Sequence, residues 1–78
     1  MPYEIDDRSS VPSYRQLEGQ LRAEIAAGDF KDRPLPSNNR LVQETGLAMM
    51  TVRRAIEELE KDGLVIAVPG RGTFVRER

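Results

Sequence analysis

Residues 51–75 read TVRRAIEELEKDGLVIAVPGRGTFV, a helical pattern that passes directly into a hairpin pattern. The apolar residues of the first half recur at the three- and four-residue spacing of a buried helix face: Val52, Ala55, Ile56 and Leu59. We therefore predict a helix over residues 49–62. The apolar run 64–68, a Pro-Gly-Arg-Gly turn and the run 73–75 then predict a β-hairpin whose tip carries Arg71 between two glycines.

Two further helices are predicted before this stretch. The first spans residues 12–27 and carries an apolar stripe at helical spacing, formed by Tyr14, Leu17, Leu21 and Ile25. The second spans residues 38–45, with Ser37 as its capping residue and Gly46 at its end. The loop 29–36 between them contains prolines and charges. Two of its residues are expected to anchor it in the core: Phe30 and Leu35.

The order of these elements predicts the fold. Two helices joined by a tight turn at Gly46, the second longer than the first, form a helix-turn-helix. Three helices followed by a hairpin with a basic tip predict an α+β, mainly α, winged helix-turn-helix domain over residues 11–76. Residues 1–10 are polar without sustained periodicity, and we expect a flexible arm there. A chain of 78 residues has room for one small domain, so no effector-binding domain is expected.

Composition excludes several classes of protein. The chain has no cysteine and no histidine, which removes the usual general base, the thiol nucleophile and the common transition-metal ligands. We therefore expect neither an enzyme nor a bound metal or cofactor. The N-terminus lacks the apolar run of a signal peptide or membrane span. A cytoplasmic protein without a membrane partner is expected, associated with the nucleoid when bound to DNA.

Charge is distributed unevenly along the chain. The formal net charge of -1 argues against a nonspecific polycation. Acidic residues gather at the N-terminus and over residues 57–60, whereas arginines gather in the last third of the chain: Arg53, Arg54, Arg71, Arg76 and Arg78. A locally basic face is therefore compatible with an acidic total.

Several ordered motifs resemble the GntR family of bacterial transcription regulators. They are Tyr14-Arg15-Gln16-Leu17, Leu35-Pro36-Ser37, the run from Thr51 to Ile56, and the run from Leu59 to Val75. The resemblance implies a dimeric repressor-type regulator whose winged helix binds a near-palindromic operator, with a separate C-terminal domain for a small effector. We expect double-stranded DNA with inverted half-sites as the partner, a weak homodimer on that DNA, and no small-molecule effector site within this chain.

The start of the second helix is the first expected DNA contact. Ser37, Asn38 and Asn39 can cap the helix and also bind a phosphate through its free N–H groups. The resemblance implies a Glu-Arg pair where this chain has Asn38 and Asn39, a capping Ser or Thr where it has Ala48, and an arginine where it has Met49. Asn39 therefore lacks the charge that an arginine would add.

The third helix should present its polar side to the major groove. Arg53 is the candidate for a base edge or a phosphate, and Arg54 for a backbone phosphate or an ion pair with Glu58. Met49 is expected to pack at the edge of the core. Met50 falls on the polar side, where its thioether can meet a thymine methyl or another protein.

The hairpin tip supplies the last expected contact. The glycines permit the turn, but only a functional role explains the long cation of Arg71, which can enter a narrow minor groove. From the resemblance, DNA contacts carry over to Ser37, Thr51, Arg53, Arg71 and Gly72. The full expected set of DNA-contacting residues is Ser37, Asn38, Asn39, Met50, Thr51, Arg53, Arg54, Arg71, Gly72 and Thr73.

Two alternatives remain open. The acidic total, the exposed methionines and the uncharged Asn38 and Asn39 are also compatible with a protein-interaction module that kept the fold and lost DNA affinity. The domain can equally be a DNA-binding head cut from a larger regulator, including an aminotransferase-like regulator whose enzyme lies elsewhere. The sequence does not distinguish a natural single-domain regulator from such a fragment.

Overall fold

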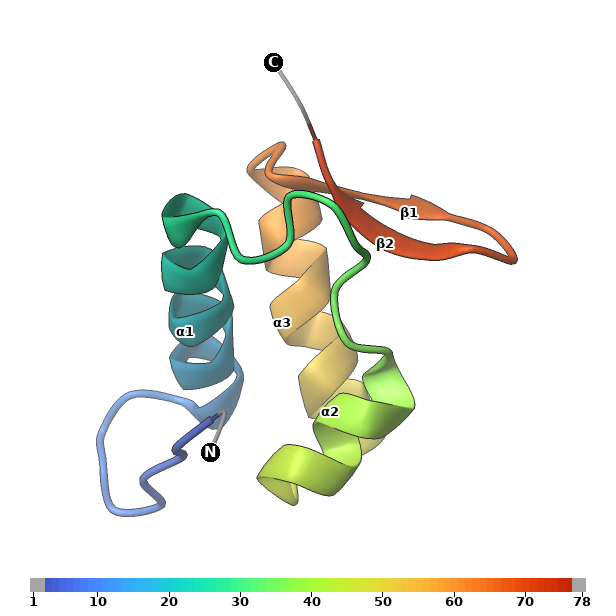
Figure 1. Ribbon diagram of the computed structural model, residues 1–78. Helices are drawn as coiled ribbons and strands as arrows, with labels where there is room; N and C mark the ends of the chain where they lie inside the picture. The colour runs from blue at the N-terminus through green and yellow to red at the C-terminus, as the bar shows by residue number, and fades with distance from the viewer. Residues whose placement is uncertain (1–2, 77–78) are drawn as a thin grey trace.

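The computed structural model describes residues 3–76, with three helices followed by a two-stranded sheet (Figure 1). In chain order the elements are α1 (Ser13–Ala27), α2 (Asn38–Thr45), α3 (Met49–Lys61), β1 (Val65–Val68) and β2 (Gly72–Val75). The predicted elements are confirmed to within one residue at each end. Pro12 is the N-cap of α1 and Asp62 the C-cap of α3, so both lie just outside the helices in which we expected them.

The core forms where α1 and α2 pack against α3. Its largest fully buried side chains are Leu17, Leu21, Leu41, Val52 and Leu59. Phe30 and Leu35 are also buried, which confirms them as the anchors of the loop between α1 and α2. Tyr14 and Ile25, by contrast, are only partly buried and pack at the edge of the core. No helix within residues 3–76 has both the length and the apolar character needed to cross a membrane.

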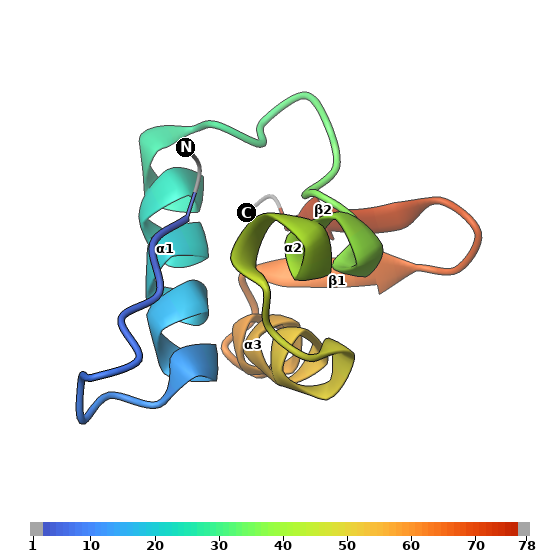
Figure 2. The ribbon, with the colours of Figure 1, turned by 90° about the horizontal axis from the view of Figure 1, so that it is seen from below.

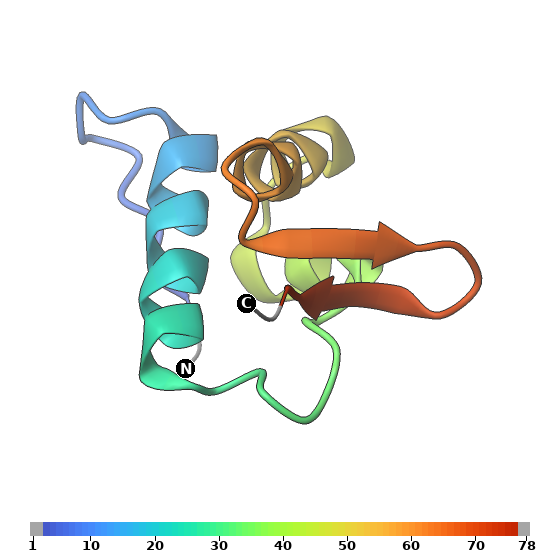
Figure 3. The same cartoon turned by 90° about the horizontal axis from the view of Figure 1, so that it is seen from above.

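The hairpin joins the helices at its base and projects at its tip. β1 and β2 are antiparallel, with Val65 opposite Val75. Val65 is buried whereas its neighbour Ile66 is exposed, so the strands contact the core on one side only. The N–H of Leu35 donates to the carbonyl oxygen of Thr73 at 2.8 Å, which links the loop before α2 to β2. Figures 2 and 3 show the hairpin extending on the side of the molecule away from α1.

The N-terminal segment differs from the expectation of a flexible arm. Tyr3 is buried in the core, and its hydroxyl donates to Oε1 of Glu24 at 2.7 Å. Burial and this hydrogen bond to a carboxylate both raise the pKa of Tyr3. The polar composition of the segment led us to expect no fixed structure, because it gave no sign that the Tyr3 ring is buried. This one buried ring attaches the segment to the core. Residues 1–2 of the expected arm lie outside the described residues.

Two glutamines of α1 hold the same segment in place. The side-chain amide of Gln20 accepts from the N–H of Glu4 at 3.0 Å and donates to its carbonyl oxygen at 2.6 Å. Gln16 does the same for Asp6, at 2.8 Å and 3.0 Å. The two glutamines are one helical turn apart, and the residues that they bind, Glu4 and Asp6, are two positions apart in the chain. The side-chain amides therefore bond the backbone of this segment in the way that a neighbouring β-strand would.

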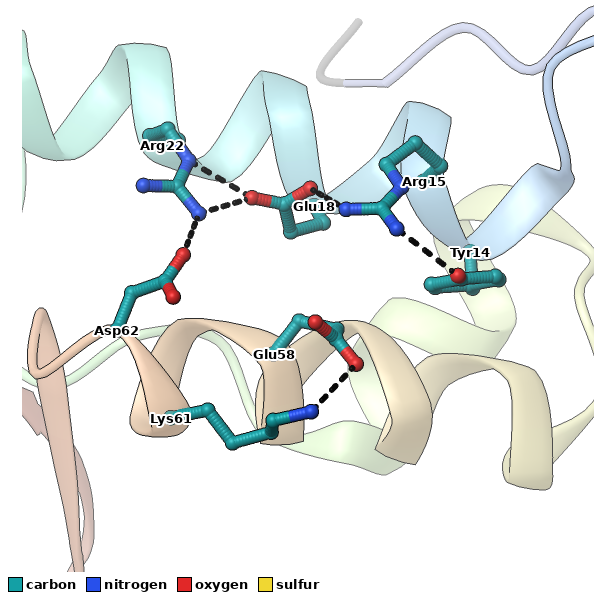
Figure 4. A network of polar contacts seen from close by, with 7 residues as sticks. All are labelled: Tyr14, Arg15, Glu18, Arg22, Glu58, Lys61 and Asp62. Carbon is teal, nitrogen blue, oxygen red and sulfur yellow. Dashed lines mark hydrogen bonds and ion pairs between the residues drawn. The ribbon is translucent and has the colours of Figure 1, made fainter.

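A chain of ion pairs, here called the α1–α3 seam, links Arg15, Glu18 and Arg22 of α1 to Asp62 at the end of α3 (Figure 4). Glu18 is only 4% exposed, and it accepts from Nε of Arg22 at 2.7 Å. Arg22 also donates to Asp62 at 2.5 Å, and Arg15 lies 3.7 Å from the other Glu18 oxygen. The hydrogen bonds to Asp62 and Glu18 raise the pKa of Arg22. The seam therefore satisfies the one buried carboxylate of the described chain and ties α1 to the end of α3.

Candidate nucleic-acid interface

The start of α2 is built as an N-terminal cap. The Oγ of Ser37 accepts from the N–H of Arg40 at 3.1 Å, which confirms Ser37 as the capping residue. Ser37 and Asn39 are exposed and Asn38 is half-buried. The first turn of a helix directs N–H groups and the positive end of the helix dipole outward. This end of α2 can therefore receive an anion through its backbone, beside the exposed Arg40 of the same turn.

The first turn of α3 is exposed, and no side chain caps its N-terminus. Its N-cap, Ala48, makes no side-chain capping bond. Met49 and Met50 are both exposed, at 36% and 71%. Met49 is not among the partly buried side chains that pack against the core, so the packing expected for it at the core edge is not seen. Arg53 and Arg54 are exposed, in contrast to the buried Val52–Leu59 face of the same helix. α3 thus presents a polar face with two exposed thioethers, where the sequence predicted only that of Met50.

The hairpin tip is a tight turn that lines the same hollow as the start of α2. The N–H of Arg71 donates to the carbonyl oxygen of Val68 at 2.9 Å and closes the turn. Gly72 follows at φ +131°, where a side chain is strained, and an added Cβ would lie 3.4 Å from Cβ of Pro34. Gly72 therefore permits both the turn and the close approach of the loop before α2. The side chain of Arg71 is exposed.

The expected contact residues divide between two hollows on either side of α3. We call the first the wing hollow, since it lies between the loop before α2, the starts of α2 and α3, and the hairpin tip. Its lining includes Ser37, Asn38, Asn39, Met49, Arg53, Arg71, Gly72 and Thr73. We call the second the α1 hollow. Its lining is Tyr14, Met50, Thr51, Arg53, Arg54, Glu57, Glu58 and Lys61. Arg53 lines both, so it lies at the centre of the face.

The cations around these hollows fall into two groups. Arg40 pairs with Glu44 at 2.8 Å, a hydrogen bond that raises its pKa, and Lys61 lies 3.7 Å from Glu58. The second group makes no ion pair within residues 3–76: Arg33, Arg53, Arg54 and Arg71. Because these four guanidinium groups keep their full charge, the face is locally positive although the chain as a whole is not.

Two residues of this face were missing from the sequence-based set. Arg33 lines the wing hollow with its guanidinium 5.3 Å from the ring centre of Phe30. The only sequence signal was its place in a charged loop directly before the Leu35-Pro36-Ser37 motif. Tyr14 was assigned to the buried stripe of α1, yet its ring lies 4.1 Å from the guanidinium of Arg54. The alternative ion pair of Arg54 with Glu58 does not form, because Glu58 faces Lys61 instead.

Comparison with known proteins places the chain among transcription regulators. Residues 13–75 match the family described as "Bacterial regulatory proteins, gntR family". The chain is 40% identical over 72 residues to the HTH-type transcriptional repressor NagR of Bacillus subtilis (strain 168), covering 91% of this chain and 30% of NagR. It is 36% identical over 67 residues to the repressor MngR of Escherichia coli (strain K12), covering 85% and 28%. The chain therefore spans less than a third of the length of these relatives.

Solved structures agree with this placement. YtrA from Sulfolobus acidocaldarius, a GntR-family transcription factor, superposes with a TM-score of 0.85 at 31% identity, covering 100% of this chain and 83% of that one. The DNA-binding domain of AraR in complex with operator ORR3 superposes with a TM-score of 0.82 at 31% identity, covering 97% and 93%. The three helices and hairpin are thus a winged helix of the kind found in these DNA-binding domains. On the sequence match, which spans most of its length, this chain belongs to the GntR family of bacterial regulatory proteins.

Proposed function

We propose that this chain binds duplex DNA sequence-specifically as the reading domain of a bacterial transcription regulator. The observation that carries the proposal is the set of arginines without ion pairs in the described chain, arranged on both sides of the exposed face of α3. A duplex presents a groove with phosphates along both edges, so a helix flanked by cations on both sides matches it in shape and in charge.

The proposed contacts follow from the two hollows. α3 enters the major groove, with Met50 and Arg53 toward base edges and Thr51 beside them. The capped start of α2, with Ser37, Asn38 and Asn39, binds a phosphate. On the other side of α3, Arg54 faces a second stretch of backbone.

The hairpin reaches the neighbouring minor groove. There Arg71 responds to the width of the groove, and Gly72 and Thr73 bring the backbone of β2 close to the sugar-phosphate chain. The AraR domain that superposes on this chain was solved with operator DNA, which supports the same mode of binding here.

Two copies of the domain are proposed to bind inverted half-sites. One small head contacts too few bases to specify a site alone, and paired heads mirror a palindromic operator. We expect the chain to dimerise weakly without DNA. If each head neutralises about four phosphates, log affinity falls with log salt at a slope of about -3.6 per head.

Selection from a random duplex pool followed by titration of the selected duplex tests the proposal. We expect an enriched inverted repeat and a Kd that rises with salt along this slope. The matched control is Arg8→Ala, which removes an exposed arginine that lines neither hollow and should leave the Kd unchanged. No enrichment, or no duplex binding at about 50 mM salt, would favour a protein-interaction module instead.

A further inference from the structure

The ring of Tyr14 lies against two guanidinium groups. The Cζ of Arg54 is 4.1 Å from the ring centre, and that of Arg15 is 5.2 Å away. Arg15 also donates to the Tyr14 hydroxyl at 3.2 Å. The two arginines come from different helices, α1 and α3, so Tyr14 connects the start of α1 to the DNA-facing side of α3.

The Tyr14 ring is held by the core on one side and by Arg15 at its hydroxyl. The residue is half-buried and packs against the core at the start of α1. Figure 4 shows Arg15 between the Tyr14 hydroxyl and Glu18, the buried carboxylate of the α1–α3 seam. The ring therefore has less freedom than an aromatic side chain on an open surface.

Arg54 is held without being neutralised. Within residues 3–76 no ion pair engages it, and Glu58, one turn along α3, faces Lys61. An aromatic ring attracts a cation through its quadrupole but carries no charge of its own, so the guanidinium keeps its full charge and its donors. A carboxylate partner would hold Arg54 just as well and would cancel that charge.

We propose that Tyr14 is a positioning residue that orients Arg54 toward a DNA phosphate on the α1 side of the groove. This inference rests on the proposed function. Arg54 lies in the α1 hollow beside Met50 and Thr51, on the opposite side of α3 from the hairpin. Because the side chain is oriented before binding, less rotamer entropy is lost when it meets the phosphate.

A double-mutant cycle on the full chain tests the coupling. Tyr14→Leu, Tyr14→Phe, Arg54→Gln and Tyr14→Leu/Arg54→Gln are titrated against the selected duplex at several salt concentrations, with melting temperatures measured alongside. Arg54→Gln should make the salt slope shallower by about 0.9. Tyr14→Leu should raise the Kd about fivefold, which corresponds to about 1 kcal/mol of rotamer entropy for ordering the Arg54 side chain on binding. Tyr14→Phe keeps the ring but loses the hydroxyl that Arg15 contacts, so its Kd should rise less than that of Tyr14→Leu.

The decisive comparison is between Arg54→Gln and the double variant Tyr14→Leu/Arg54→Gln. In the Arg54→Gln background, Tyr14→Leu should leave the Kd unchanged, although any effect on the melting temperature persists. An equal loss in both backgrounds, or no loss in either, would overturn the positioning role while leaving the proposed function intact. A parent chain that binds no duplex would overturn the proposed function itself and this inference with it.

Discussion

The α1–α3 seam and the exposed side of α3 are both rich in arginine, but their arginines have opposite surroundings. In the seam, Arg15 and Arg22 share the buried Glu18, and Arg22 also reaches Asp62. On the exposed side of α3, Arg53 makes no ion pair within the described chain. The same side chain is neutralised in one region and left charged in the other.

This difference explains how a chain with a net charge of -1 can present a basic face. In the seam, Arg15 and Arg22 balance Glu18 and Asp62. The arginines around α3 and the hairpin make no ion pair within the described chain and outnumber the carboxylates of the two hollows that make none there, Glu24 and Glu57. The comparison predicts a clean division of effects. Substitutions of Arg22 and Asp62, at the end of the seam away from Tyr14, should change stability and not DNA affinity. Substitutions of exposed arginines on α3 and the hairpin should do the reverse.

The largest effect is expected from Arg53→Ala. Arg53 lines both hollows, so it contacts the duplex near the centre of the interface in the proposed complex. Binding to the selected duplex should weaken by roughly 3 kcal/mol, the upper range for loss of one arginine contact. The melting temperature should not change, because the side chain is exposed. A drop in melting temperature with unchanged Kd would place Arg53 on the structural side of the comparison.

The next effect is expected at the hairpin tip. Arg71→Ala should weaken binding by roughly 2 kcal/mol, make the salt slope shallower by about one unit and remove a preference for A/T-rich flanks. Arg71→Lys should restore the slope but only part of the flank preference, because an ammonium is more strongly hydrated in a narrow groove. Measurements on A/T and G/C flanks that do not separate these variants from the parent would show that the tip lies outside the groove.

A smaller effect, on stability and not on DNA affinity, is expected in the seam. Arg22→Ala removes the closest partner of a carboxylate that is 4% exposed, so the free energy of unfolding should fall by about 1–2 kcal/mol in urea titrations. Asp62→Asn is the matched control. It breaks only the exposed part of the seam and should cost less than about 0.5 kcal/mol. The Kd of both variants for DNA should equal that of the parent, and a changed salt slope in Arg22→Ala would contradict the division.

The smallest effect concerns base preference. Met50 is 71% exposed and off the core face, so Met50→Ala should leave the melting temperature nearly unchanged. We expect it to relax a preference for T at one position of each half-site by roughly 1 kcal/mol, through loss of contact with the thymine methyl. Comparing T with U at that position isolates the methyl group. Equal weakening on every sequence would mean that Met50 supports the helix and does not read a base.

The elements of this fold could be predicted from sequence because their signals are local. The buried face of α3, the cap at Ser37 and the turn around Arg71 each depend on neighbours within a few residues. Arg53 and Arg71 could be predicted as exposed side chains beside the hollows for the same reason. Each is an exposed cation whose position follows from its own helix or turn.

The missing features depend on contacts between distant segments. The stacking of Arg54 on Tyr14 joins α3 to α1, and local spacing suggested the pair with Glu58 instead. Arg33 enters the wing hollow only because the loop before α2 is bonded to β2 through Leu35. Helical periodicity carries no information on such tertiary neighbours, so these residues required the structure.

The docking of the N-terminal segment by Gln16 and Gln20 has a consequence for dynamics. The amide protons of Glu4 and Asp6 are bonded to side chains of α1, so their hydrogen exchange reports local opening of this segment. The amide protons beyond the first turn of α3 are bonded within a helix that packs in the core, and they should exchange only on global unfolding. Exchange rates at these two places therefore measure separately whether the segment detaches and whether the winged helix unfolds, including when DNA is bound.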